Sequence, residues 1–125
     1  MSSRELDILV VDDNLDFAEM LADVVQLRGY RCQVAGSGEE CVRYVARHAV
    51  DVVFMDVMLP GMDGVAAARA VQALRPEAAI LLVTGYTDEN LRRRAEQDGF
   101  PVIYKPVTVD RVLMAVDQIP LRKPT

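Results

Sequence analysis

The sequence has 125 residues, of which 51% are apolar and 26% are charged, and its formal net charge is −5 at pH 7. This length and composition are typical of one globular domain. The acidic balance argues against direct binding to nucleic acid or to an anionic membrane, because both attract a positive field. No apolar stretch approaches the roughly 20 residues of a membrane span, and no signal peptide is visible at the start. We therefore expect a cytoplasmic protein whose two cysteines, Cys32 and Cys41, stay reduced.

Five short segments predict the strands of a sheet. Apolar runs of this length, bounded by turn-forming residues, are typical of buried strands. The second segment alternates apolar and polar side chains, as a half-exposed edge strand does. The first, third and fourth are nearly continuous apolar runs, as strands covered on both faces are. The five segments are residues 6–11, 30–35, 50–56, 79–84 and 102–105.

A segment with helical apolar spacing follows each predicted strand. These segments are residues 15–28, 39–48, 65–75, 89–98 and 109–118. In the first helix we expect two apolar stripes, of which one faces the core and the other is partly exposed. The expected core stripe is Phe17, Met20, Leu21, Val24 and Leu27. The expected exposed stripe is Leu15, Ala18, Ala22 and Val25.

Strict alternation of strand and helix predicts a parallel sheet with helices on both faces. With right-handed crossovers, five strands favour the order 2-1-3-4-5, which also puts the alternating second strand at an edge. The predicted fold is therefore α/β: a doubly wound five-stranded parallel sheet, or flavodoxin-like (βα)5 three-layer sandwich. We expect one domain over residues 1–125, with a core at about 6–119.

Polar side chains follow four of the predicted strands where each strand ends. They are Asp12 and Asp13 after the first strand, Asp56 after the third, Thr84 after the fourth and Lys105 after the fifth. Because these strands are neighbours in the predicted order, the five side chains converge on one edge of the sheet. Three carboxylates in one place repel one another, and a hard divalent cation such as Mg²⁺ is the natural compensation.

This combination of groups favours phosphoryl chemistry. A metal, an ammonium group and a hydroxyl group are what a phosphoryl group in transfer requires, because its charge spreads over several oxygens. Asp56 would then be the nucleophile that forms an aspartyl phosphate. Taken singly, each residue also has an ordinary interpretation as a helix cap, a turn hydroxyl or a strand terminus. The functional interpretation depends on their coincidence at one end of four adjacent strands.

The chain resembles the receiver domain of two-component response regulators over essentially its whole length. This resemblance implies that Asp56 takes a phosphoryl group from a histidine of a sensor histidine kinase or a histidine phosphotransfer protein. The product switches the surface around the fourth helix and fifth strand. The family motifs are matched at residues 8–14, 55–64, 83–85 and 104–106.

The resemblance also implies a set of Mg²⁺ ligands. Asp13 would bind the metal directly, and Asp12 mainly through water. The carboxylate of Asp56 and the backbone carbonyl of Met58 would complete the protein ligands. The resemblance further implies that Thr84 and Lys105 would bind the phosphoryl oxygens.

One position departs from the family pattern. The family often has an aromatic switch residue three positions before the lysine, and here that position is Val102. Tyr104 lies directly before the lysine, and we do not expect it to substitute for the residue at 102. We therefore expect the switch to run through Thr84, residues 85–86 and the sparsely packed fourth helix. The bond before Pro106 is expected to be cis, as in the family.

Other interpretations concern context and class. The chain can be a stand-alone regulator, a receiver segment of a hybrid histidine kinase, or part of a larger regulator, as a monomer or a phosphorylation-dependent dimer with an unknown output partner. We expect it to catalyse only its own phosphorylation and dephosphorylation. An aspartate-nucleophile phosphatase also uses Asp at a strand end, but it requires Asp-x-Asp, and the second of these positions is Met58.

Overall fold

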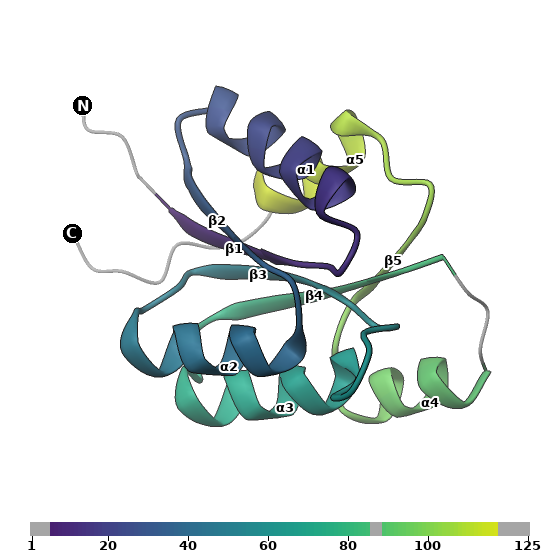
Figure 1. Cartoon of the computed structure of the whole chain (residues 1–125). Coiled ribbons are helices and arrows are strands. Elements are labelled where there is room, and N and C mark those ends of the chain that lie inside the picture. The colour runs from purple at the N-terminus through teal and green to yellow at the C-terminus, as the bar shows by residue number, and fades with distance from the viewer. Residues whose placement is uncertain (1–5, 86–88, 118–125) are drawn as a thin grey trace.

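Strands and helices alternate along the whole of the described chain. The computed structural model describes residues 6–85 and 89–117, and these contain five strands and five helices (Figure 1). The strands are β1 (Asp7–Val11), β2 (Arg31–Ala35), β3 (Val52–Asp56), β4 (Ala79–Thr84) and β5 (Val102–Tyr104). The helices are α1 (Leu15–Leu27), α2 (Gly38–Arg47), α3 (Gly64–Leu74), α4 (Glu89–Gln97) and α5 (Val109–Asp117). Within these ranges, none of the helices has the length and apolar character to cross a membrane.

The strands form one parallel sheet in the order β2-β1-β3-β4-β5. Helices α1 and α5 cover one face, and α2, α3 and α4 cover the other (Figure 1). The predicted doubly wound α/β fold and its strand order are therefore confirmed. The edge position of β2 is confirmed as well, because Arg31 and Gln33 are exposed while Cys32 and Ala35 are buried.

The sheet separates two hydrophobic clusters. Successive strand side chains point to opposite faces. In β3, Val53 and Met55 pack with α2 and α3, whereas Val52 and Phe54 pack with α1 and α5. All five residues of β3 are buried. This explains why the predicted central strand reads as a continuous apolar run rather than an alternating one.

The predicted core stripe of α1 is only partly confirmed: Leu21 is buried and Phe17 packs against the core, but Ala18, Ala22 and Val25 of the expected exposed stripe are buried as well. Met20 is 40% exposed and Leu27 is 87% exposed, so neither faces the core. The predicted core stripe and the predicted exposed stripe lie next to each other on the helix surface, on either side of Leu21. In the structure the helix turns its smaller residues toward the sheet. Small side chains permit close packing on the sheet, whereas the longer apolar residues remain at the flanks. The buried residues of α1 are Ala18, Leu21, Ala22 and Val25.

The start of α3 packs directly on the end of β3. Asp63, which the sequence indicates only as part of a turn, is the N-cap of α3 and accepts a hydrogen bond from Ala66 N–H at 2.8 Å. Gly64 N–H donates to the Val57 carbonyl at 2.9 Å. A Cβ atom on Gly64 would collide with the Asp56 carbonyl oxygen and would lie 2.7 Å from Val57 Cα. Only glycine therefore fits at this contact between helix and strand.

We expect Gly64→Ala to lower the free energy of unfolding by roughly 1–3 kcal/mol, since backbone atoms of β3 would have to move. Gly36→Ala is the matched control, because a Cβ there would make only ordinary contacts, the nearest at 3.6 Å. Urea unfolding of both variants measures the difference. Equal stability of the two variants would contradict the close packing at Gly64.

Candidate functional site

The ends of β1 and β3 bring three carboxylates together. Asp12 follows β1 and is 2% exposed, and Asp56 ends β3 and is 7% exposed. Asp13 lies beside them and is exposed to solvent. One oxygen from each of the three residues lies within 4.8 Å of the others. The predicted acidic cluster is therefore present.

Asp12 links the cluster to its surroundings. Its Oδ1 accepts a hydrogen bond from Asn14 N–H at 2.9 Å, and its Oδ2 accepts one from Lys105 Nζ at 3.2 Å. The backbone N–H of Asp12 donates to the Ala35 carbonyl at 3.1 Å, which fixes the end of β1 against β2. A buried carboxylate with these partners is both oriented and partly neutralised.

Asp56 lies beside Asp12 in the same buried edge. Its Oδ1 accepts a hydrogen bond from Met58 N–H at 3.1 Å, and its Oδ2 is 3.9 Å from Lys105 Nζ. Burial raises the pKa of Asp56 to about 6, and the charge of Asp12 acts in the same direction. The Met58 N–H and the Lys105 ammonium oppose these effects by favouring the charged form. Asp56 is therefore an acid whose ionisation depends on its cationic neighbours.

Lys105 and Thr84 lie on neighbouring chain segments at this edge. Lys105 N–H donates to the Thr84 carbonyl at 2.8 Å, which continues the pairing of β4 with β5. The Thr84 residue is 7% exposed, and the Lys105 side chain is 27% exposed. The bond between Lys105 and Pro106 is cis, as predicted.

The donor set fits a hard divalent cation. Carboxylate oxygens are the ligands that Mg²⁺ and Ca²⁺ prefer, and the exposed Asp13 leaves one side of the cluster open to water. Three carboxylates face one ammonium group, so the cluster has an excess of negative charge. The predicted ligand role of the Met58 carbonyl stays a prediction, although the Met58 N–H already contacts Asp56.

Sequence reasoning missed one neighbour of the site. Phe17, assigned to the core, is half-buried and presents its ring to Lys105, with Nζ 4.5 Å from the ring centroid. The sequence feature that pointed to this neighbour is an aromatic residue three positions after Asn14, the N-cap of α1. Val102, at the position of the family's aromatic switch, is half-buried, and Tyr104 is 46% exposed. Residue 86, which the expected switch includes, lies outside the described residues.

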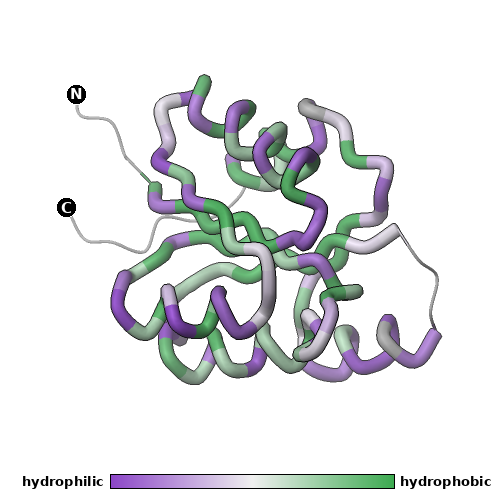
Figure 2. Tube along the Cα trace, viewed as in Figure 1, coloured by the Kyte–Doolittle hydropathy of each residue, from purple (hydrophilic) through white to green (hydrophobic). Residues whose placement is uncertain are grey.

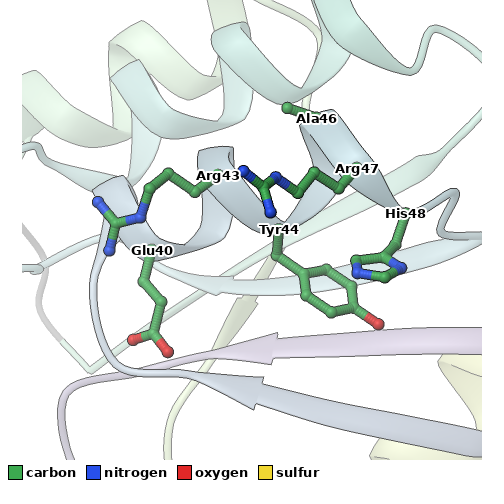
Figure 3. Close-up of a pocket in the computed structure, with 6 residues that line it drawn as sticks. All are labelled: Glu40, Arg43, Tyr44, Ala46, Arg47 and His48. Carbon is green, nitrogen blue, oxygen red and sulfur yellow. The ribbon is translucent and has the colours of Figure 1, made fainter.

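An open hollow of about 530 Å³ lies along α2, away from the acidic cluster. Figure 3 shows Tyr44 and His48 on the same side of this helix, and their stacked rings are 4.5 Å apart. The hollow shares no residue with the acidic cluster. Its lining residues are Glu40, Arg43, Tyr44, Ala46, Arg47 and His48.

Comparison with known proteins identifies similar sequences. A family model described as the response regulator receiver domain matches residues 8–117. The chain is 30% identical over 109 residues to the C4-dicarboxylate transport transcriptional regulatory protein DctD of Rhizobium meliloti, a match that covers 86% of this chain and 24% of that protein. It is 34% identical over 113 residues to the sensor histidine kinase RcsC of Salmonella typhimurium, which covers 87% of this chain and 12% of that one. The chain thus spans about a quarter or less of the length of these relatives.

A solved structure has the same fold. It is a response regulator protein from Burkholderia pseudomallei with a phosphorylated aspartic acid, a calcium ion and citrate. The two chains superpose with a TM-score of 0.83 at 29% sequence identity, over 91% of this chain and 68% of that chain.

The raised pKa of Asp56 predicts a pH-dependent stability. The folded value is about 6 against an ordinary 3.8, so ionisation at neutral pH destabilises the folded state. The stability that the protonated carboxyl gives is complete below about pH 4 and is lost as the pH rises through about 6. We expect Asp56→Asn to be more stable than the wild type by on the order of 2–3 kcal/mol at about pH 7.5, and about equal to it near pH 4.

Urea unfolding without divalent metal at both pH values measures this difference. Asp23→Asn, at an exposed position on α1, is the matched control for the loss of one carboxylate. A constant difference between Asp56→Asn and the wild type across the range would show that the carboxyl of Asp56 is not perturbed.

Proposed function

Since this chain belongs to the response regulator receiver domain family, we propose that Asp56 is the phosphoacceptor through which it receives a signal from a histidine-phosphorylated partner. The observation that carries this proposal is the position of Asp56. It is a buried carboxylate, its Oδ2 lies 3.9 Å from an ammonium group, and two further carboxylates lie beside it. A buried acid with a perturbed pKa at the carboxyl edge of a parallel sheet is a strong candidate for chemistry.

In the proposed reaction a carboxylate oxygen of Asp56 attacks the phosphorus of a phosphohistidine. The N–P bond of the histidine breaks as the O–P bond forms, and the imidazole leaves with the electron pair of the broken bond. The ammonium of Lys105 binds one phosphoryl oxygen, for which its distance of 3.9 Å from Asp56 Oδ2 leaves room. The hydroxyl of Thr84 donates to another. Both contacts stabilise charge that develops on the transferring group.

We assign the metal site to Mg²⁺, held by the carboxylates of Asp12, Asp13 and Asp56 and by the Met58 carbonyl. Bound there, Mg²⁺ neutralises phosphoryl oxygens and allows three carboxylates to stay ionised together. The donor chemistry of the cluster supports this assignment. The calcium ion and phosphorylated aspartic acid of the Burkholderia pseudomallei relative also support it.

The proposed biological role is that of a signalling module in the cytoplasm, with residues 1–125 forming one receiver unit. Its partners are a sensor histidine kinase or a histidine phosphotransfer protein and an output partner of unknown type. The relatives include both a transcriptional regulator and a sensor histidine kinase, so either context suits a segment of this kind. Direct nucleic-acid or membrane binding is not part of the proposal. In solution we propose a monomer or a phosphorylation-dependent dimer.

The phosphatase alternative has little support from the site. The second aspartate of Asp-x-Asp would supply the general acid, and this chain has Met58 in that place. The Met58 side chain is 43% exposed and has no proton to donate. We therefore propose that the chain turns over only its own phosphoryl group.

We also propose that α4 carries the response to phosphorylation. Among its described side chains Ala95 is the buried one, and Figure 2 shows most of the helix as hydrophilic. Two ion pairs tie the segment to α3: Arg94 with Asp63 at 3.4 Å, and Arg69 with Asp98 at 2.6 Å. A helix held by few apolar contacts is among the elements that move most easily. We propose that the site acts on α4 through Thr84.

Incubation with acetyl phosphate and Mg²⁺, followed by intact mass measurement, tests the acceptor. We expect one added phosphoryl group on the wild type and none on Asp56→Asn. Asp13→Asn should slow phosphorylation by roughly tenfold or more, since removing one metal ligand weakens the metal site. Asp23→Asn keeps the same net charge as Asp13→Asn and should react at the wild-type rate. An adduct that persists in Asp56→Asn would assign the acceptor to another residue.

Hydrogen exchange tests the proposed switch. We expect amides of residues 89–98 to change their exchange rates on phosphorylation, while amides of β1 and β3 remain protected. Mass spectrometry of peptides from the acetyl phosphate-treated wild type and from Asp56→Asn gives the comparison. Unchanged exchange in α4, with Asp56 fully phosphorylated, would refute this route.

A further inference from the structure

Lys105 is held at the site from three directions. Its Nζ donates to Asp12 Oδ2 at 3.2 Å, lies 3.9 Å from Asp56 Oδ2, and lies 4.5 Å from the ring centroid of Phe17. Of the described carboxylates, Asp12 alone accepts a hydrogen bond from this ammonium group. The Lys105 side chain is 27% exposed, so its contacts with the two carboxylates do not shield it fully from solvent. The aromatic ring lies on a further side of the ammonium group.

The position of the ring is set by the same short segment that orients the carboxylate. Asn14 N–H donates to Asp12 Oδ1 at 2.9 Å, and the side chain of Asn14 accepts a hydrogen bond from Phe17 N–H at 3.2 Å. Asn14 is the N-cap of α1, and Phe17 is the third residue of that helix. These two bonds link the carboxylate of Asp12 to the start of the helix that carries the ring, so two of the three neighbours of Lys105 come from residues 12–17.

The chemistry of an aromatic ring adds something that an aliphatic residue does not. A phenyl face attracts a cation through its quadrupole, and the attraction is stronger where water is partly excluded. Phe17 is half-buried at the margin of the cluster that α1 and α5 share. Its packing alone would be satisfied by leucine, but leucine would not attract the ammonium group.

We infer that Phe17 is a positioning residue for Lys105: its ring holds the ammonium at the carboxylates of Asp12 and Asp56, where it meets the incoming phosphoryl group. This inference rests on the proposed phosphoacceptor role of Asp56. It also gives the site an aromatic partner on α1, whereas the β5 position often aromatic in the family is Val102. The ring acts through Lys105 and touches neither the phosphoryl group nor the metal.

The contact itself is tested by NMR of the full chain with labelled lysine, without metal or phosphate donor. In the wild type the ring current of Phe17 should move the Lys105 Hε protons upfield. Phe17→Leu should return them to the ordinary lysine position, and Phe17→Tyr should keep the upfield shift. Lys105 Hε protons without an upfield shift in the wild type would overturn the inference, whatever the outcome for phosphorylation.

The functional effect is tested by the initial rate of phosphorylation with acetyl phosphate and Mg²⁺. We expect Phe17→Leu to lower the rate roughly twofold to tenfold, the range that one cation–π contact supports, and Phe17→Tyr to restore it. Progressively fluorinated phenylalanine at position 17 keeps the shape of the ring while weakening its attraction for a cation, so it separates this role from folding. The rate should fall stepwise along that series.

The NMR measurement and the rate measurement together distinguish a failure of this inference from a failure of the proposed function. Equal rates along the fluorinated series, with an active wild type, would reduce Phe17 to a packing residue and leave the proposed function intact. A wild type that takes up no phosphoryl group would overturn the proposed function and with it the catalytic part of this inference. The NMR shift would still decide whether Phe17 holds Lys105.

Discussion

The structure depends on placing three carboxylates and one ammonium group at a single edge of a parallel sheet. Two of the carboxylates are almost fully buried, and desolvation of a charge is costly unless a partner compensates it. Lys105 supplies part of that compensation, and the raised pKa of Asp56 shows that it is incomplete. The remaining excess of negative charge makes the cluster suitable for a divalent cation. In the proposed reaction, that cation would also offset the repulsion between the carboxylates and an incoming oxyanion.

The backbone around Asp56 is as restricted as its side chain. Asp56 ends a strand that is buried along its whole length, and the start of α3 is packed on the next peptide through Gly64. This packing fixes the position of the Asp56 carboxylate at the end of β3. In the proposed function, the acceptor carboxylate would therefore be rigidly held, while the responding element would be the more loosely packed α4.

Much of this architecture could be predicted from the sequence, because the relevant physics is local or follows from topology. Alternating apolar periodicities predicted the layers, and the meeting of strand ends predicted the acidic cluster around Asp56. The face of α1 could not be predicted in this way. Its two candidate stripes overlap around Leu21, and only the packed neighbours decide between Met20 and Ala22. The contact of Phe17 with Lys105 joins opposite ends of the chain, so spacing alone could not reveal it.

Because the sheet divides the core into two clusters, a change at Asp56 would reach the surface of the molecule through two separate sets of contacts. Asp56 ends the central strand β3, whose side chains contribute to both hydrophobic clusters, and each cluster belongs to a different helical layer. On one side, Lys105 and Phe17 lead into α1. On the other, Asp63 caps α3 and pairs with Arg94 of α4. If Asp56 is phosphorylated as we propose, the added charge would act on both helical layers through separate contacts, so a substitution in one layer would leave the contacts of the other unchanged.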